Sequence, residues 1–209
     1  MSESIDLTTR RGALFAALAA GVGVSALASR ANAELAAVRE LSPTVEALIA
    51  ASGAEGGVHD WDYLMGDWTA VNRRMKKRWT GNPEWDEFPA TTTYVQFMGG
   101  LVNVDDTEFP TRGFGGVTLR AFSPEKKRWS IYWINSRDGV VTAPMVGAYS
   151  GNVGHFYGDD VDDGVPIVAR FIRTKKPPNE ERWEQAFSKD GGKTWETNWT
   201  ADFTRVKRA

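Results

Sequence analysis

Cysteine is absent from this chain of 209 residues, and histidine occurs only twice, as His59 and His155. Without cysteine, the chain can form no disulfide, thiol nucleophile, iron–sulfur cluster or thiolate zinc site. Two histidines also leave little of the usual ligand set of redox metals. We therefore expect neither a bound metal nor a resident cofactor.

The sequence also lacks a marked excess of either charge sign, with 25 Lys and Arg against 27 Asp and Glu. A balanced charge gives no footprint for a polyanion, so we expect no nucleic-acid partner. The longest apolar run, 13–28, spans ~16 residues, whereas a helix needs about 20 to cross a membrane. We expect no stable membrane span in the mature protein.

The first 33 residues have the features of an export signal. Arg10 and Arg11 precede the apolar run, and Arg30 precedes a small-residue cleavage site that ends at Ala33. Paired arginines, a weakly hydrophobic run and a basic residue before the cleavage site resemble a twin-arginine signal. A general secretory signal or a lipid-retained anchor is the alternative. We expect cleavage near Ala33 and a periplasmic mature protein.

Residues 34–58 contain the helical part of the mature chain, followed by a glycine-rich joint. Apolar residues recur at helical spacing over 34–51. Ser42 and Pro43 interrupt that stretch and suit an N-cap and a first helical position, which predicts two short helices. Residues 59–209 then form the second region.

From Gly66 onward the sequence alternates strand-like segments with turn residues. The predicted strands are 67–79, 90–98, 101–109, 114–122, 128–136, 144–150, 153–158, 166–173, 181–188 and 194–206. Every connection is short enough for a hairpin, so the strands should be antiparallel and follow chain order. About nine or ten strands must close or cover their edges. We predict an all-β, antiparallel, up-and-down barrel.

Residues 188–195, "SKDGGKTW", resemble the Asp-box repeat of sialidase propellers. In those proteins the box is a turn away from the active site, and several boxes recur at blade spacing. One box is present here, without a repeat of blade length. We interpret it as a hairpin turn and reject a glycosidase.

Gly66 and Trp68 open the first long strand, and Arg205 lies in the last. This G-x-W motif with a late arginine resembles lipocalins and the wider calycin group. The resemblance implies that the arginine stacks on the tryptophan and closes one end of the barrel. Longer stretches, such as "HDWDYLMGDWTAVNRRMKKR", "RWSIYWINSR" and "DGGKTWETNW", look like a bacterial family of unknown function with a calycin-like barrel. That resemblance implies a fold and brings no activity.

Two charged segments invite functional interpretations. The acidic run 159–164 fails the calcium-loop template, because Val161 and Arg170 occupy positions that need oxygen ligands, so we expect a solvated hairpin tip. The basic run 73–78 is interpreted as a solvated, edge-protecting strand, with Asp86 and Glu87 near enough to neutralise it. A mouth that attracts an acidic ligand is the alternative.

The interior of the predicted barrel is the candidate site. Isolated polar residues within apolar strand faces are typical of a ligand cavity. The candidate ligand-binding residues are Asn103, Arg120, Tyr132, Arg170 and Glu184. The leading hypothesis is a binding protein for a small, partly apolar or aromatic molecule with an anionic or carbonyl group. Alternation alone leaves open which face of each strand points inward.

Two other functions remain open at this point. A cofactor-free isomerase, dehydratase or hydrolase would use Glu184 or Asp105 as acid or base, and Arg120 or Arg170 to stabilise negative charge. A barrel with a filled interior would act through its surface. His155 suits a general base or a haem ligand, but a histidine without a partner is more often an ordinary packed residue. No nucleophile-elbow, P-loop or dinucleotide motif occurs.

Overall fold

The computed structural model describes residues 40–81, 83–176 and 178–207. Apart from Glu40, these residues belong to one compact unit, Leu41–Ala209. The predicted export signal and most of the first expected helix lie outside the described residues.

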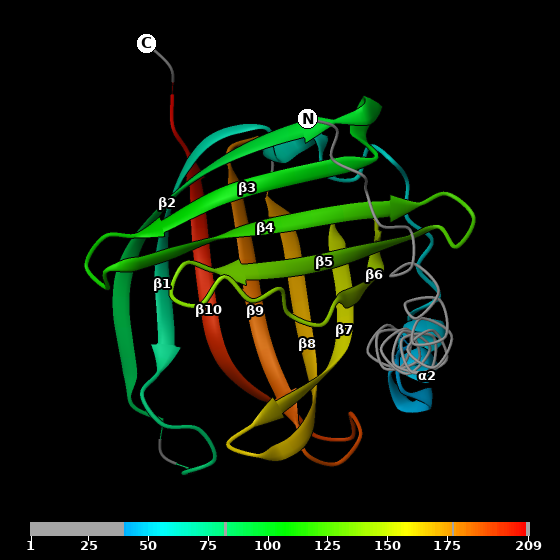
Figure 1. Ribbon diagram of the computed structural model, residues 1–209, viewed down its shortest axis with the longest axis vertical. Coiled ribbons are helices and arrows are strands. Elements are labelled where there is room, and N and C mark those ends of the chain that lie inside the picture. The colour runs from blue at the N-terminus through cyan, green and yellow to red at the C-terminus, as the bar shows by residue number, and fades with distance from the viewer. Residues whose placement is uncertain (1–39, 82, 177, 208–209) are drawn as a thin grey trace, which may run out of the picture. The chain divides into compact units, whose positions relative to one another are not determined.

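Ten strands in the described part of the chain close into one antiparallel barrel (Figure 1). They are β1 (Gly66–Met75), β2 (Trp85–Phe97), β3 (Val102–Phe109), β4 (Phe114–Ser123), β5 (Arg128–Asn135), β6 (Met145–Ser150), β7 (Val153–Asp162), β8 (Val165–Lys176), β9 (Glu180–Ser188) and β10 (Glu196–Arg205). Each strand pairs with its neighbours in the chain, and β1 pairs with β10 to complete the ring. The predicted all-β, up-and-down barrel is confirmed.

Side chains alternate along each strand between the inside of the barrel and its outer surface. In β2, buried and exposed residues alternate from Phe88 to Tyr94, as expected when one face packs inside and the other meets solvent. β3–β5 cross β6–β10 at a steep angle, so the barrel has two walls whose inward faces oppose each other (Figure 1). β5 and β6 pair over only three residues, and the 136–144 loop runs on from the end of β5.

Helix α2 (Pro43–Ser52) packs on the outer face of this barrel. The Ser42 hydroxyl accepts a hydrogen bond from the Val45 amide, and Pro43 occupies the first turn, as the sequence predicts. Val45 and Ile49 are buried in a cluster with Val168 and a tyrosine of β7. The 3₁₀ turns η2 (Asp62–Leu64) and η3 (Met98–Gly100) precede β1 and follow β2.

One end of the barrel, which we call the closed end, is blocked by Trp68 and Arg205. The Arg205 guanidinium lies 4.3 Å from the centre of the Trp68 ring, and its Nη1 donates to the Met65 carbonyl at 2.6 Å. The indole Nε1 of Trp68 donates to the Leu64 carbonyl. The predicted stacking of the late arginine on the G-x-W tryptophan is therefore confirmed.

The Asp-box segment forms the turn between β9 and β10. Asp190 Oδ1 accepts from the amides of Lys193 and Thr194, at 3.1 and 2.9 Å, and Ser188 Oγ accepts from the Gly192 amide at 2.8 Å. Gly192 has φ of 90°, which only glycine adopts freely. The interpretation of this motif as a turn is confirmed.

The charged segments differ in part from their predicted roles. The acidic run ends in the exposed β7–β8 turn at Asp163 and Gly164, as predicted for a hairpin tip, but its first part belongs to β7, where Asp162 is buried and pairs with Arg78. The basic run is not an edge, because β1 is paired on both sides in a closed barrel and ends at Met75. Glu87 lies 3.9 Å from Arg73 of this run, as expected, whereas Asp86 pairs with Arg112 outside it.

Candidate functional site: the barrel interior

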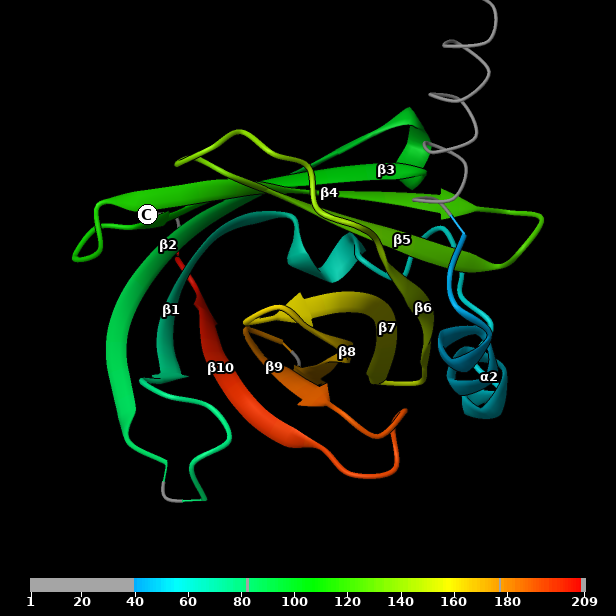
Figure 2. The same cartoon turned by 60° about the horizontal axis from the view of Figure 1, so that its bottom comes forward.

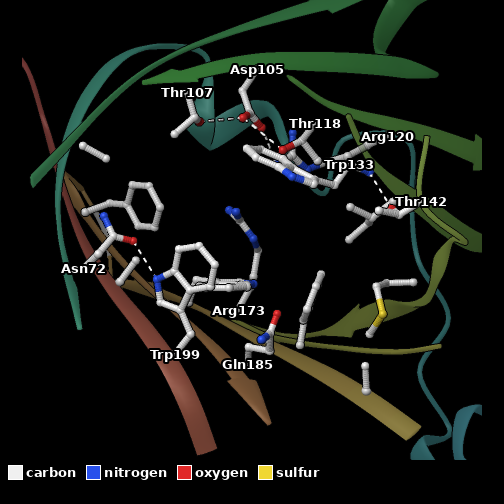
Figure 3. Close-up of a pocket in the computed structure, with 18 of the residues that line it drawn as sticks. Asn72, Asp105, Thr107, Thr118, Arg120, Trp133, Thr142, Arg173, Gln185 and Trp199 are labelled. Atoms are coloured by element: carbon white, nitrogen blue, oxygen red, sulfur yellow. Dashed lines mark hydrogen bonds and ion pairs between the residues drawn. The ribbon is translucent and has the colours of Figure 1, made fainter. Parts of the chain in front are cut away.

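The barrel encloses a cavity of about 280 Å³. Figure 3 shows its lining, to which nearly all strands contribute. Its large apolar and aromatic side chains include Phe109, Ile131, Trp133, Phe171, Trp183 and Trp199. Its polar side chains include Asn72, Thr107, Thr118, Arg120, Arg173 and Gln185. A mostly apolar wall with a few placed polar groups is typical of a small-molecule site.

Asp105 and Arg120 form a buried ion pair in the wall of β3 and β4. Thr107 and Thr118 place their hydroxyls 2.9 and 3.1 Å from Asp105 Oδ2, and Arg120 Nη1 donates to Asn103 Oδ1 at 3.2 Å. Strand register explains the grouping, because Asn103 pairs with Arg120 and Asp105 with Thr118 across β3 and β4. The carboxylate is therefore already held by three side chains.

A second buried ion pair lies near the closed end. Arg173 Nη1 donates to Glu181 Oε1 at 2.7 Å, and the Tyr63 hydroxyl donates to the same oxygen at 2.9 Å. Burial raises the pKa of Glu181, and the Arg173 charge opposes that rise. The pKa of Tyr149, whose hydroxyl lies 3.0 Å from that of Tyr63, is raised well above its ordinary value by burial.

Trp61 connects the two ion pairs. Its ring centre lies 4.7 Å from the Arg120 guanidinium and 5.2 Å from the Arg173 guanidinium. Cation–π contacts of this kind gain strength where water is excluded. The contacts orient both arginines and fix the floor of the cavity.

Asn72 carries an unused hydrogen-bond donor in the cavity wall. Its Oδ1 accepts from Trp199 Nε1 at 3.0 Å, as Figure 3 shows. An indole nitrogen only donates, so this contact fixes the orientation of the amide and leaves Nδ2 as a donor. Asn72 is 3% exposed, and Nδ2 has no partner among the described residues. A buried donor without a partner costs about 1–3 kcal/mol, which a ligand acceptor would recover.

The structure divides the five predicted site residues into two groups. Arg120 lines the cavity. Asn103 is buried beside Arg120 and accepts a hydrogen bond from it. Tyr132, Arg170 and Glu184 belong to the opposite faces of β5, β8 and β9.

The exclusion of these three residues follows from alternation. Trp133 lines the cavity from β5, as do Phe171 from β8 and Gln185 from β9, so the residue beside each points away from it. Arg170 instead stacks on Trp195, at 4.3 Å from its ring centre. We therefore remove Tyr132, Arg170 and Glu184 from the candidate site.

Sequence reasoning missed Asn72, Arg173 and Trp199 as a group. Strict alternation over the four residues from Trp195 to Trp199 would put both on one face, but the register shifts between Thr197 and Trp199, as in a β-bulge. Trp195 consequently packs outside, in the cluster of α2, while Trp199 lines the cavity. Arg173 could have been found from the sequence, because it lies two residues after Phe171 and alternation puts both side chains on the same face of the strand.

His155 does not line the cavity and is half-buried on β7. Burial and the nearby Arg170 lower its pKa. Within 40–81, 83–176 and 178–207, no three His, Asp or Glu side chains gather as metal ligands would. The same ranges contain no helix of the length and apolarity that a membrane span requires.

No protein family and no curated protein matches the chain. Among solved structures, the chain is similar to the crystal structure of Rv2717c from M. tuberculosis, with a TM-score of 0.46 and 12% sequence identity. The match covers 80% of this chain and 100% of the other. The barrel assignment stands on the strand pairing described above.

Proposed function

We propose that the protein binds a small, partly apolar or aromatic molecule inside the barrel. The unused Nδ2 donor of Asn72, buried in a cavity lined by aromatic rings, carries this proposal. The ligand presents a hydrogen-bond acceptor to Asn72 and stacks on the surrounding aromatic side chains. The cavity volume of about 280 Å³ argues against the alternative of a filled barrel that acts through its surface.

Binding is favoured over catalysis because Asp105, the buried carboxylate in the cavity wall, is already engaged. Asp105 receives Arg120, Thr107 and Thr118. Glu181 receives Arg173 and Tyr63 at Oε1 and has no hydrogen-bond partner at Oε2 among the described residues, but it does not line the cavity. A general base needs a free lone pair within reach of the proton that it removes. A cofactor-free isomerase, dehydratase or hydrolase is the second candidate, and it would require Asp105 to leave at least one of its partners.

We further propose that the protein reaches the periplasm through its amino-terminal signal. The paired Arg10 and Arg11, the apolar run and the cleavage site near Ala33 support this location. Changing Arg10→Lys and Arg11→Lys together should retain the uncleaved protein in the cytoplasm. Normal export of that variant would point to the general secretory route instead.

The binding proposal is tested by mass spectrometry of small molecules extracted from the protein, purified gently from its own cell compartment. Asn72→Asp keeps the side-chain size and the acceptor for Trp199 but replaces the free donor with a carboxylate. We expect its affinity for the extracted compound to fall about tenfold, since one hydrogen bond is lost and an acceptor is repelled.

Tyr132→Phe is the matched control, because Tyr132 lies outside the cavity, and it should bind as the wild type does. Equal affinity in Asn72→Asp would show that the ligand is not held at Asn72. If no compound is extracted, titration with N-phenylnaphthylamine, a neutral fluorescent aromatic probe, decides whether the cavity accepts a ligand.

A further inference from the structure

At the end of the barrel opposite the closed end, three arginines stack on the rings of one aromatic cluster. We call this end the rim; Figure 2 turns it toward the viewer. The pairs are Arg74 over Trp199, Arg112 over Phe88 and Arg137 over Phe114, with distances to the ring centres of 4.6, 4.6 and 4.1 Å. The three arginines come from β1, the β3–β4 turn and the loop after β5.

The rings beneath these arginines form one cluster that continues into the cavity. Phe109 lies 5.7 Å from Phe88, 4.8 Å from Phe114 and 6.0 Å from Trp199, measured between ring centres. Phe109 and Trp199 also line the cavity. The arginines are therefore held at the margin of the ligand site rather than on a remote surface.

The rim arginines differ from the interior ones in their charge balance. Arg120 and Arg173 each pair with a buried carboxylate. Neither Arg74 nor Arg137 forms an ion pair with any of the described residues, whereas Arg112 pairs with Asp86. Uncompensated positive charge is thus concentrated at the rim and not at the floor of the cavity.

The positive groups are close enough to act on one another. The pKa of Arg74 is lowered, first by its burial against Trp199 and its neighbours and then by the charges of Arg78 and Arg137. Repulsion between like charges is relieved when an anion lies between them. Asp159 and Asp160 line the cavity from β7, which lies across the ring of strands from β1 and two strands from β5, and they would repel an anion from that side.

Strand geometry links the rim to the unused donor. Asn72 and Arg74 lie two residues apart on β1, so they share a face at a separation of roughly 7 Å. Arg74 pairs directly with Trp199 across β1 and β10, and Trp199 in turn donates to Asn72. The indole ring thus forms one wall between a donor in the cavity and a charge at the rim.

We propose that the ligand of the barrel is an organic anion, with an aromatic or apolar body in the cavity and a carboxylate, sulfonate or phosphate group at the rim between Arg74 and Arg137. The hydrogen-bond acceptor on the body meets Asn72. This proposal rests on the proposed function, because it assigns a charge and an orientation to a ligand of the same cavity.

Two fluorescent probes that differ mainly in charge test the proposal. Anilinonaphthalene sulfonate carries an anionic group on the same aromatic framework as N-phenylnaphthylamine, which is neutral. Titrating the purified protein with each probe separates binding of the aromatic body from binding of the charge. The test variant is the double change Arg74→Gln and Arg137→Gln.

The matched control is Arg73→Gln. Arg73 is exposed, lies next to Arg74 on the opposite face of β1, and is 3.9 Å from Glu87. We expect the double variant to weaken binding of the sulfonate about tenfold and to leave the neutral probe within about twofold, since only the charge-assisted contacts are lost. Arg73→Gln should leave both probes unchanged, and added salt should weaken only the sulfonate.

The outcomes separate this inference from the proposed function. If the neutral probe binds while the sulfonate is unaffected by the double variant, the anion proposal is wrong and the binding function stands. An equal loss in Arg73→Gln would also overturn the proposal, because the effect would then come from the general field of the protein. If neither probe binds and Asn72→Asp changes nothing, the proposed function itself fails.

Discussion

The buried pair of Glu181 and Arg173 offers a quantitative test of how the closed end is stabilised. Glu181→Gln preserves the size of the side chain and an oxygen that accepts from Arg173 and Tyr63, so it removes the negative charge without opening a cavity. What remains is a guanidinium that is almost fully buried without a counter-charge. The change therefore isolates the electrostatic contribution.

The magnitude follows from the geometry. At the observed distance of 2.7 Å between Arg173 Nη1 and Glu181 Oε1, an effective dielectric constant near 20 gives an attraction of about 6 kcal/mol. Removing the carboxylate also removes its own desolvation penalty, which is several kcal/mol. We expect a net loss of about 3 kcal/mol in the free energy of unfolding, which lowers the melting temperature by roughly 6–12 °C.

Equilibrium unfolding in urea, followed by tryptophan fluorescence, measures this loss. The double variant Glu181→Gln with Arg173→Met removes both charges of this pair and keeps an apolar stem against Trp61, so it should recover at least half of the lost stability. A loss below about 1 kcal/mol in the single variant would refute the reasoning. So would a double variant that is no more stable than the single one.

Two further predictions concern the ends of the barrel. Arg205→Met should destabilise the protein by about 2–3 kcal/mol, because two buried carbonyls lose a charged donor and Trp68 loses its stacked guanidinium; thermal melting against wild type measures it. The pKa of Asp162 is lowered, first by its hydrogen bond from Arg78 and then by that from Trp79, although burial opposes both. Its stabilising contribution is therefore complete above the unfolded value of about 3.9 and is lost as the pH falls through the lower folded value. The urea midpoint of wild type, recorded between neutral and strongly acidic pH, should fall as the pH is lowered, and that of Asp162→Asn should fall less. The same pH dependence in both proteins would contradict the assignment.

The sequence predicts the fold of this protein well because the relevant signals are local. Turn residues at short intervals and alternation within each segment define an antiparallel barrel, and Ser42 with Pro43 defines the start of a helix. The stacking of Arg205 on Trp68 could be predicted because the G-x-W motif opens the first strand of the barrel and an arginine lies in its last strand.

The composition of the site could not be predicted with the same success, because a one-residue change of register exchanges the two faces of a strand. Tyr132 and Trp133 are both aromatic, and only Trp133 lines the cavity. The register shift before Trp199 has no mark in the sequence. Asn72 lies just before a basic run that reads as a solvated strand, and only the closed barrel shows that it is buried. Arg74, within the run, is exposed and stacks on Trp199 at the rim.

The distribution of arginines with and without a carboxylate partner gives the site a direction. Near the closed end, Arg120 and Arg173 have their carboxylates, so a ligand charge placed there would have to compete with an existing buried ion pair. Nearer the rim, Asn72 has a donor without a partner, and Arg74 and Arg137 have charges without carboxylates. A ligand gains free energy by bonding to polar groups that have no partner in the protein, and gains little from groups that already have one. A molecule that enters with its apolar end first, and leaves its charge at the rim, satisfies each of these groups without breaking either ion pair.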